Sequence, residues 1–325
     1  MMEREATTIA DAAVSAGPAG SPACCPGPAR ARTGLRWLLF HNRDSIIGGI
    51  LLLLALSGIS GLVLITWFIF SAGLPIIWQT GLGHFLFGAT WAPESHEFGI
   101  FAMILGSLAV TGGAMVVAAS FGVGCAIVLT QFCPRWLVSI LKPAIELLAG
   151  IPSVVYGFIG VVTLAPLISR WLGGTGLSVL AAAIVLGVMV LPTVTSISID
   201  ALQAVPRSYR DGSIALGATQ WQTTRMVMLR SARSGLLAAF ILGMGRAIGE
   251  TMAVIMVAGN VIQIPTSLLN PVRTLTSTIG MEMSYASGDH RQALFATGVV
   301  LFVIIMILNT VALTLSGKRA RSAGS

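Results

Sequence analysis

Long apolar runs alternate with short polar intervals along most of this chain. The apolar runs fall at residues 46–70, 101–129, 147–168, 177–199, 235–262 and 293–315. Each run reaches the roughly 20 residues that a helix needs to cross the hydrocarbon core of a membrane. Strands are not expected, because the alternation over about ten residues that marks a membrane-spanning strand is absent. The pattern predicts an all-α integral membrane protein with six transmembrane helices.

Composition and charge agree with that prediction and add an orientation. Hydrophobic residues make up 55% of the chain, charged residues make up 10%, and the mean hydropathy is +0.88. These values exclude a typical soluble globular domain. Most of the 19 Lys and Arg residues lie near the termini or in the intervals 135–142 and 207–233, whereas the opposite loops hold Arg170, Arg273 and Arg291. The positive-inside rule then places both termini and the 207–233 interval in the cytoplasm.

This bias also accounts for the net charge of +7. A nucleic-acid partner is not predicted, because no basic patch is interleaved with aromatic residues. None of the four Cys residues has a metal-ligand spacing with a His, so no metal site is predicted either. The four His residues are interpreted as solvated or interfacial side chains.

The boundaries of the apolar runs suggest how the chain is organised. Residues 1–44 are interpreted as a flexible cytoplasmic tail, because the first 36 are rich in Ala, Gly and Pro and lack apolar periodicity. Residues 45–100 would hold the first transmembrane helix and an outer loop. Residues 101–316 would form a five-helix core, and residues 317–325 a second cytoplasmic tail.

The polar interval at residues 200–233 carries the signals of a helix-turn-helix. Pro206 can open a short helix, and Gly217 can close it in the left-handed conformation. Thr219 and Gln222 have the spacing of a capping box for the next helix. A loop of defined shape between two membrane spans is suited to docking, so we expect this interval to bind a cytoplasmic partner.

The fifth apolar run contains two charged residues, Arg246 and Glu250. A charge within a span costs on the order of 2.5 to 3.5 kcal/mol by insertion scales, so it must face protein or water. Spacing of four predicts that the two side chains share a helical face and pair. Gly245 and Gly249, continued by Ala253, would let another helix approach beside them. The pair could lock helix packing, or it could line the route of an anion, because a guanidinium matches oxyanions with a fixed fork of donors. We favour the route.

The third apolar run contains Pro152, which removes a backbone hydrogen bond and predicts a kink or break. Ser153 or Tyr156 could bond the groups that the break leaves free. A role in packing and a role in the route are equally compatible with this segment.

A nucleotide site is not predicted in this chain. Its two lysines are Lys142, in Leu-Lys-Pro, and Lys318, in Gly-Lys-Arg. Neither has the Gly-Lys-Ser/Thr context in which a P-loop lysine reaches the phosphates of ATP. If the 200–233 interval couples transport to ATP hydrolysis, the ATPase must therefore be a separate subunit.

The 200–233 interval also resembles the EAA loop by which permeases of ABC importers engage their ATPase. The resemblance lies in Asp211-Gly212-Ser213, Gly217 and Val227-Met228-Leu229. Asp stands where that family usually has Glu, Gly-Ser where it has Ala-Ala, and Arg230 where it usually has Pro.

Together with the segments 91–93, 98–100, 149–157 and 245–260, the chain from 45 to 316 resembles the PstC family, permease subunits of phosphate ABC importers. The resemblance implies a type I importer fold, a bacterial cytoplasmic (inner) membrane location, and three partners. These are a PstA-like second permease, a PstB-like ATPase dimer that binds ATP and Mg, and a PstS-like extracytoplasmic phosphate-binding protein.

The resemblance and the motifs together give two sets of candidate residues. The candidate substrate route consists of Arg246, Glu250, Thr251, Ser153 and Tyr156. The candidate coupling residues are Tyr209, Asp211, Gly212, Ser213, Gly217 and Ala218. The function expected is phosphate import, with no cofactor bound by this chain itself. Alternatives are import of another oxyanion such as sulfate or molybdate, ATP-independent anion transport, and a purely structural scaffold in the membrane.

Overall fold

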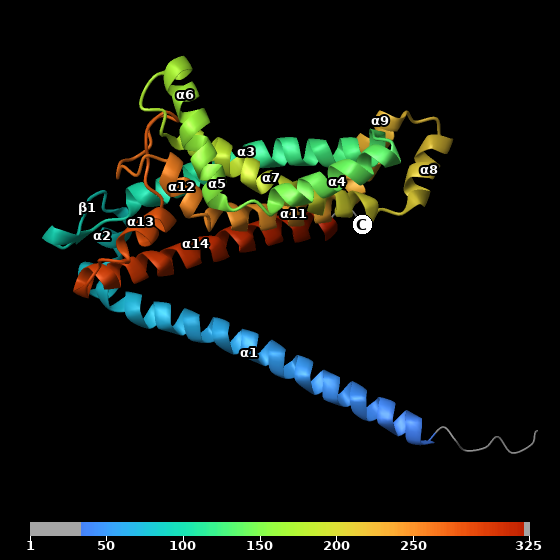
Figure 1. Cartoon of the computed structure of the whole chain (residues 1–325), viewed down its shortest axis with the longest axis horizontal. Helices are drawn as coiled ribbons and strands as arrows, with labels where there is room; N and C mark the ends of the chain where they lie inside the picture. Colours follow the sequence, from blue (N-terminus) through green and yellow to red (C-terminus); the bar gives the residue numbers. More distant parts are fainter. Residues whose placement is uncertain (1–33, 322–325) are drawn as a thin grey trace, which may run out of the picture. The chain divides into compact units, whose positions relative to one another are not determined.

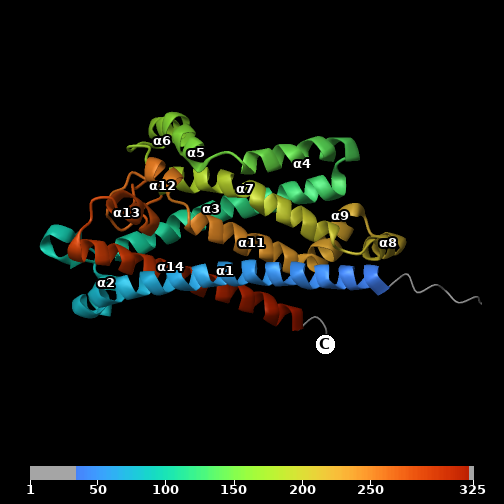
Figure 2. The same ribbon diagram turned by 60° about the horizontal axis from the view of Figure 1, so that its bottom comes forward.

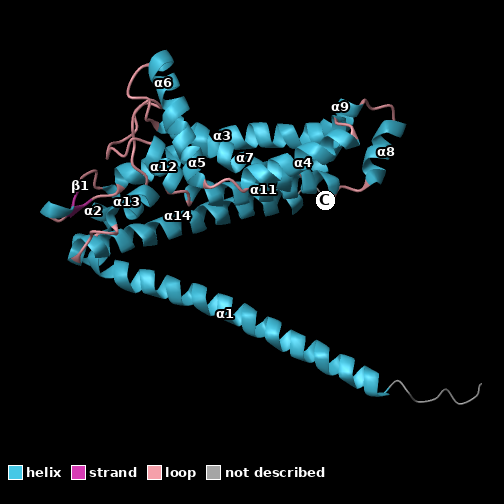
Figure 3. Ribbon diagram, viewed as in Figure 1, coloured by secondary structure: helices cyan, strands magenta, loops and turns pink. Residues whose placement is uncertain are grey.

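A computed structural model describes residues 34–321, which are mostly helical (Figure 1, Figure 3). The α-helices are α1 (Gly34–Thr80), α2 (Leu82–Phe87), α3 (Phe101–Ile127), α4 (Arg135–Ala149), α5 (Ser153–Ile159), α6 (Ala165–Leu172), α7 (Val179–Gln203), α8 (Arg207–Ala215), α9 (Gln220–Gln222), α10 (Leu229–Ser231), α11 (Arg233–Ile248), α12 (Met252–Val257), α13 (Leu275–Glu282) and α14 (Gly288–Arg321). The π-helical turns are η3 (Val128–Phe132), η4 (Gly160–Leu164) and η5 (Thr223–Met228), and η2 (Pro93–Ser95) is a 3-10 turn.

The expected all-α fold is interrupted by one short hairpin within residues 34–321. Strand β1 (Trp91–Ala92) pairs with β2 (Glu97–Phe98) in antiparallel register, with Trp91 opposite Phe98. Both aromatic side chains are buried and meet edge to face. The hairpin therefore anchors the loop between α2 and α3 through packing.

Helix α1 begins before the predicted boundary at residue 45 and has 47 residues. No Gly or Pro interrupts residues 35–47, which explains why the helix extends beyond the apolar run. The predicted tail at 1–44 otherwise falls on residues 1–33, outside the described part of the chain. At the other end α14 continues to Arg321, through the start of the predicted 317–325 tail, and residues 322–325 are again outside the described part. Contacts divide the chain into two units, with the boundary inside α1 between Leu62 and Val63.

Five helical segments in the described chain are long and apolar enough to cross a membrane. They are Ile47–Thr80, Phe101–Phe132, Ser153–Leu172, Val179–Gln203 and Gly288–Thr314. The pair Gln220–Ser231 and Arg233–Ile248, bent by 69°, makes a sixth if it counts as one span. The protein is thus a multi-pass membrane protein with five or six spans.

The centre of the second unit is the packing of α3, α7 and α11, which lie side by side in both views (Figure 1, Figure 2). Among the five spans, α7 is the most enclosed, because 61% of an 18-residue apolar stretch within it is buried. Close approach to α11 depends on Gly243, where a Cβ would lie 2.7 Å from Cγ2 of Val194. The apolar side chains at this junction form one continuous core.

The bundle carries different structures at its two ends. Helix α8 projects at one end, whereas α6, α12 and α13 lie at the other (Figure 1, Figure 2). Consequently, the predicted docking loop and the outer loops are separated by the length of the spans, as a membrane topology requires.

The fifth apolar run departs most from its prediction. It does not form one helix over 235–262, because α11 ends at Ile248 and α12 resumes only at Met252. The predicted close approach at Gly245 and Gly249 is also wrong within this chain, since a Cβ at Gly245 would meet nothing within 4 Å. The small residues that do face a neighbouring helix are Gly235, Ala239 and Gly243, on another face of α11, and Ala253 of the predicted series, which packs against Gly157 on α5.

Candidate functional site

Arg246 lies in the last turn of α11, near the end of the bent span rather than near the middle of a straight one. Its Nη1 donates to Oγ1 of Thr193 on α7 at 3.4 Å, a long and weak hydrogen bond. The guanidinium is exposed on the surface of the chain. Among the described side chains, no carboxylate lies within 4.0 Å of it. The predicted pairing with Glu250 is therefore wrong.

The break in the helix explains why these two charges do not meet. Glu250 follows the end of α11, and its Oε1 accepts a hydrogen bond from the backbone N–H of Ala253 at 3.3 Å. Its carboxylate thus caps the first turn of α12, where backbone donors lack helical partners. The backbone carbonyl oxygen of Glu250 accepts a hydrogen bond from Oγ1 of Thr276 on α13 at 2.9 Å. Thr251, the next residue, donates from Oγ1 to the carbonyl of Gly249 at 3.4 Å.

The predicted break at Pro152 is confirmed, because α4 ends at Ala149 and α5 begins at Ser153. Tyr156 bridges the break, since its hydroxyl donates to the carbonyl of Leu148 at 2.7 Å. Ser153 makes no capping hydrogen bond and remains partly exposed at the start of α5. Of the two side chains expected to satisfy the freed backbone, Tyr156 does so.

The segments that carry the predicted route residues lie next to one another. Helix α5 packs against α12, and a Cβ at Gly157 would lie 3.0 Å from Cα of Ala253 and 2.9 Å from Sδ of Met256. The two broken helices thus place Ser153 and Tyr156 on α5 beside α12, which follows Glu250 and Thr251, whereas Arg246 bonds Thr193 on α7.

The polar interval forms the predicted helix-turn-helix. Helix α8 starts after Pro206 and ends in a Schellman motif, with Gly217 N–H donating to Ile214 at 2.9 Å and Ala218 N–H to Ser213 at 3.2 Å. Gly217 has φ 83°, the left-handed region that glycine tolerates best. Thr219 and Gln222 then form both hydrogen bonds of the capping box.

The remaining coupling candidates share the outer surface of this loop. Tyr209, Asp211 and Gly212 are exposed, and Ser213 is half-buried because its hydroxyl bonds that of Thr223 at 3.0 Å. Leu216, at the end of α8, is 91% exposed. The loop is therefore fixed in shape by its own hydrogen bonds and presents Tyr209 and Leu216 outward.

Comparison with known proteins assigns the family. Residues 118–322 match the model of the family described as binding-protein-dependent transport system inner membrane component. The chain belongs to that family.

A relative from Bacillus subtilis, named probable ABC transporter permease protein YqgH, is 42% identical over 82% of this chain and 88% of its own length. Two relatives named phosphate transport system permease protein PstC are similar as well. The one from Mesorhizobium japonicum is 38% identical over 70% of this chain and 76% of its own length. The one from Haemophilus influenzae is 34% identical over 71% of this chain and 81% of its own length.

Solved ABC transporters share the fold. A chain of the MetNI methionine ABC transporter in an inward-facing conformation superimposes with a TM-score of 0.52 at 20% identity, over 66% of this chain and 92% of that one. A chain of a bacterial ABC transporter involved in the import of alginate superimposes with a TM-score of 0.55 at 13% identity, over 87% of this chain and 99% of that one. The predicted type I ABC importer permease fold agrees with these neighbours.

One polar cluster, at the end of the bundle that holds α13 and the hairpin, was not predicted from the sequence. Oε1 of Glu282 accepts from Nη1 of Arg273 at 2.7 Å, and its Oε2 lies 2.8 Å from Nε2 of His290 and accepts from Nε1 of Trp91 at 3.0 Å. The Glu282 and Arg273 side chains are only 7% and 11% exposed. The His290 side chain is 16% exposed, so protein rather than solvent surrounds most of it. This cluster ties α13 to the start of α14 and to the hairpin.

Proposed function

We propose that this chain is the permease subunit of an ATP-driven importer that moves inorganic phosphate across the bacterial cytoplasmic membrane. The family assignment supports a role in binding-protein-dependent transport. The names of the PstC relatives support phosphate as the substrate. The orientation proposed is the one that the positive-inside rule favours, with α8 and both termini in the cytoplasm.

The observation that carries the proposal is the state of Arg246. Its guanidinium lies on a membrane-spanning helix, is exposed on the chain, and has a hydroxyl rather than a carboxylate as its hydrogen-bond partner. A charge in that position requires protein, water or an anion around it. Guanidinium keeps its charge and offers parallel donors to a tetrahedral oxyanion, so phosphate passing along this surface would be a suitable partner.

The second permease subunit is proposed to complete the route. The face of α11 around Gly245 has open space, since no atom lies within 4 Å of a Cβ built there. Arg246, Glu250, Thr251, Ser153 and Tyr156 lie on or beside the broken helices that border this face. A PstA-like subunit packed against it would enclose the guanidinium, and a PstS-like protein would deliver phosphate from outside.

The α8 loop is proposed to transmit the motion of a separate ATPase. A PstB-like dimer would bind ATP and Mg, because this chain has no P-loop lysine. The loop would rest in a groove on the ATPase as an amphipathic helix does. The contact residues proposed are Tyr209, Asp211, Gly212, Ser213, Gly217 and Ala218. Closure of the ATPase dimer would move α8 and the attached spans and so alternate access to the route.

Labelled-phosphate uptake tests the proposal. Cells depleted of other phosphate carriers would express the native chain, Arg246→Gln or Arg246→Lys at matched membrane levels, with co-purification of the ATPase checked. Arg170→Gln is the matched control, because Arg170 is also exposed but lies at the end of α6 and outside the proposed route. We expect uptake to collapse in Arg246→Gln, to fall in Arg246→Lys because the donor fork is lost, and to persist in Arg170→Gln.

The same assay separates the alternatives. Uptake that survives Arg246→Gln would assign Arg246 to packing. Uptake that persists after ATP depletion would favour an ATP-independent transporter. Competition by sulfate or molybdate at concentrations that rival phosphate would point to another oxyanion.

A further inference from the structure

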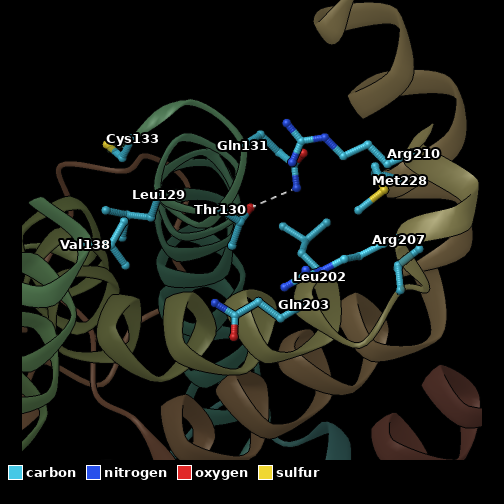
Figure 4. A pocket seen from close by; sticks show the side chains of 11 residues that line it. Leu129, Thr130, Gln131, Cys133, Val138, Leu202, Gln203, Arg207, Arg210 and Met228 are labelled. Atoms are coloured by element: carbon cyan, nitrogen blue, oxygen red, sulfur yellow. Dashed lines mark hydrogen bonds between the residues drawn. The ribbon is translucent and has the colours of Figure 1, made fainter. Parts of the chain in front are cut away.

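A second site with positively charged side chains lies at the α8 end of the bundle, whereas Arg246 lies at the end of α11 that precedes α12. A cavity of about 510 Å³ opens there between η3, the last turn of α7 and the first turn of α8. Figure 4 shows the side chains of Arg207 and Arg210 reaching into it from α8. Leu129, Val138, Leu202, Val205 and Met228 make its apolar wall. The volume is within the range of sites that bind small molecules.

Within residues 34–321, no acidic side chain compensates the charge in this cavity. Its lining contains two guanidinium groups and no carboxylate. Among the described side chains, no acidic group lies within 4.0 Å of either arginine, and the nearby Asp200 pairs with Lys142 at 3.5 Å. Two positive side chains that point into one concave space repel each other, so an anion between them would be stabilised by both.

Amide and hydroxyl groups complete the polar side of the cavity. Gln131 is buried, and its Nε2 makes only a long hydrogen bond of 3.5 Å to Oγ1 of Thr130, so it can still donate to a ligand (Figure 4). The backbone carbonyl of Gln131 is held separately by the side-chain amide of Gln220. Gln203, on α7, supplies a second amide. These donors suit an oxyanion with several acceptor oxygens.

The local backbone is also irregular on two sides of the cavity. Thr130 and Gln131 belong to the π-helical turn η3, and Met228 belongs to η5. A π-helical turn inserted in an α-helix is rare and occurs frequently at functional sites. Both turns sit where their helices border the cavity, which is consistent with a site retained for binding.

We infer that this cavity binds a phosphate-bearing anion through Arg207 and Arg210, with Gln131 and Gln203 as further donors. The group is either the headgroup of an acidic phospholipid, whose glycerol and upper acyl carbons would lie on the apolar wall, or inorganic phosphate. A cytoplasmic location for the site follows from the orientation proposed above, but binding itself does not depend on transport. Because the cavity contacts the first turn of α8, occupancy would stiffen the coupling loop against the spans.

Binding to the purified full-length chain tests this inference, in an Arg246→Gln background so that the proposed route contributes nothing. One arm titrates phosphatidylglycerol against phosphatidylcholine in detergent and counts bound lipid by native mass spectrometry. The other measures binding of radiolabelled inorganic phosphate by equilibrium dialysis. Each arm compares the unmodified cavity with Arg207→Gln/Arg210→Gln. The control is Arg225→Gln/Arg230→Gln, which removes two exposed arginines of the same loop that do not line the cavity.

We expect the cavity variant to lose one ligand, with affinity falling by about tenfold for each arginine, while the control keeps it. Selective loss of phosphatidylglycerol identifies the lipid headgroup, and selective loss of labelled phosphate identifies the free anion. The inference is overturned if neither ligand binds the unmodified cavity, if both bind the cavity variant equally well, or if the control loses as much affinity. None of these outcomes bears on Arg246, so phosphate import is tested separately.

Discussion

Replacing Glu282 by Gln should severely destabilise the end of the protein that holds α13 and the β1–β2 hairpin. Glu282 accepts hydrogen bonds from Arg273 and Trp91 and contacts His290, and its side chain is only 7% exposed. Glutamine keeps one acceptor oxygen but removes the negative charge, so Arg273 becomes a buried cation without a counter-charge. The amide nitrogen of glutamine replaces the other oxygen, so at least one N–H group that was bonded to that oxygen would face another N–H group.

The magnitude follows from the loss of a buried pair. Removing one partner of such a pair costs about 3 to 5 kcal/mol, mainly because the remaining charge stays buried. At roughly 2 °C for each kcal/mol in a large chain, the melting temperature should fall by at least about 6 °C. Thermal unfolding of the detergent-purified full chain measures this shift. Glu94→Gln is the control, since Glu94 is exposed in the loop between α2 and α3 and its loss should cost within about 0.5 kcal/mol.

A double variant separates the charge from the size of the side chain. Glu282→Gln combined with Arg273→Met removes both charges, and an apolar replacement of a buried pair is often nearly neutral. The double variant should therefore melt above Glu282→Gln, with a coupling between the two sites of about 2 kcal/mol. A Glu282→Gln melting temperature equal to that of Glu94→Gln would refute the reasoning, as would strict additivity in the double variant.

Three further predictions concern single residues. Gly217→Val should abolish phosphate uptake while membrane insertion stays normal, because a β-branched residue strains the φ of 83° that shapes the loop; normal uptake would remove the coupling role. Gly243→Val should lower the melting temperature by a few degrees, because its side chain would overlap Val194, whereas Gly245→Ala should leave it unchanged or raise it; equal effects would contradict the packing of α11. Tyr156→Phe should cost about 1 kcal/mol in denaturant unfolding, and an unchanged midpoint would mean that its bond to Leu148 contributes nothing.

The helix-turn-helix at residues 206–222 could be predicted from the sequence because all its signals are local. Pro206 precedes α8, Gly217 has the left-handed conformation, and Thr219 bonds Gln222 three residues away. Each of these interactions acts within one or two turns of chain. Five of the six predicted spans could be predicted for a similar reason, since length and hydropathy are properties of each segment alone.

Features that depend on distant partners could not be predicted in this way. Trp91 and Glu282 are 191 residues apart in the sequence, and no periodicity connects them. The break after Ile248 lies within an apolar run, so composition favoured a continuous helix there. Thr276, which holds the carbonyl of Glu250 at the break, comes from α13, 26 residues later.

The break in the fifth run changes what the two charged residues do for each other. In a continuous helix, Glu250 would neutralise Arg246, and the guanidinium would have little affinity left for another anion. In the structure the Glu250 carboxylate caps α12 and its carbonyl is held by Thr276, so both of its polar groups are engaged elsewhere. Arg246 keeps a single long hydrogen bond, to Thr193, among the described side chains. The segment 246–250 therefore places the negative charge of Glu250 at the first turn of α12, and it leaves the positive charge of Arg246 exposed, where a ligand or a second subunit could bind.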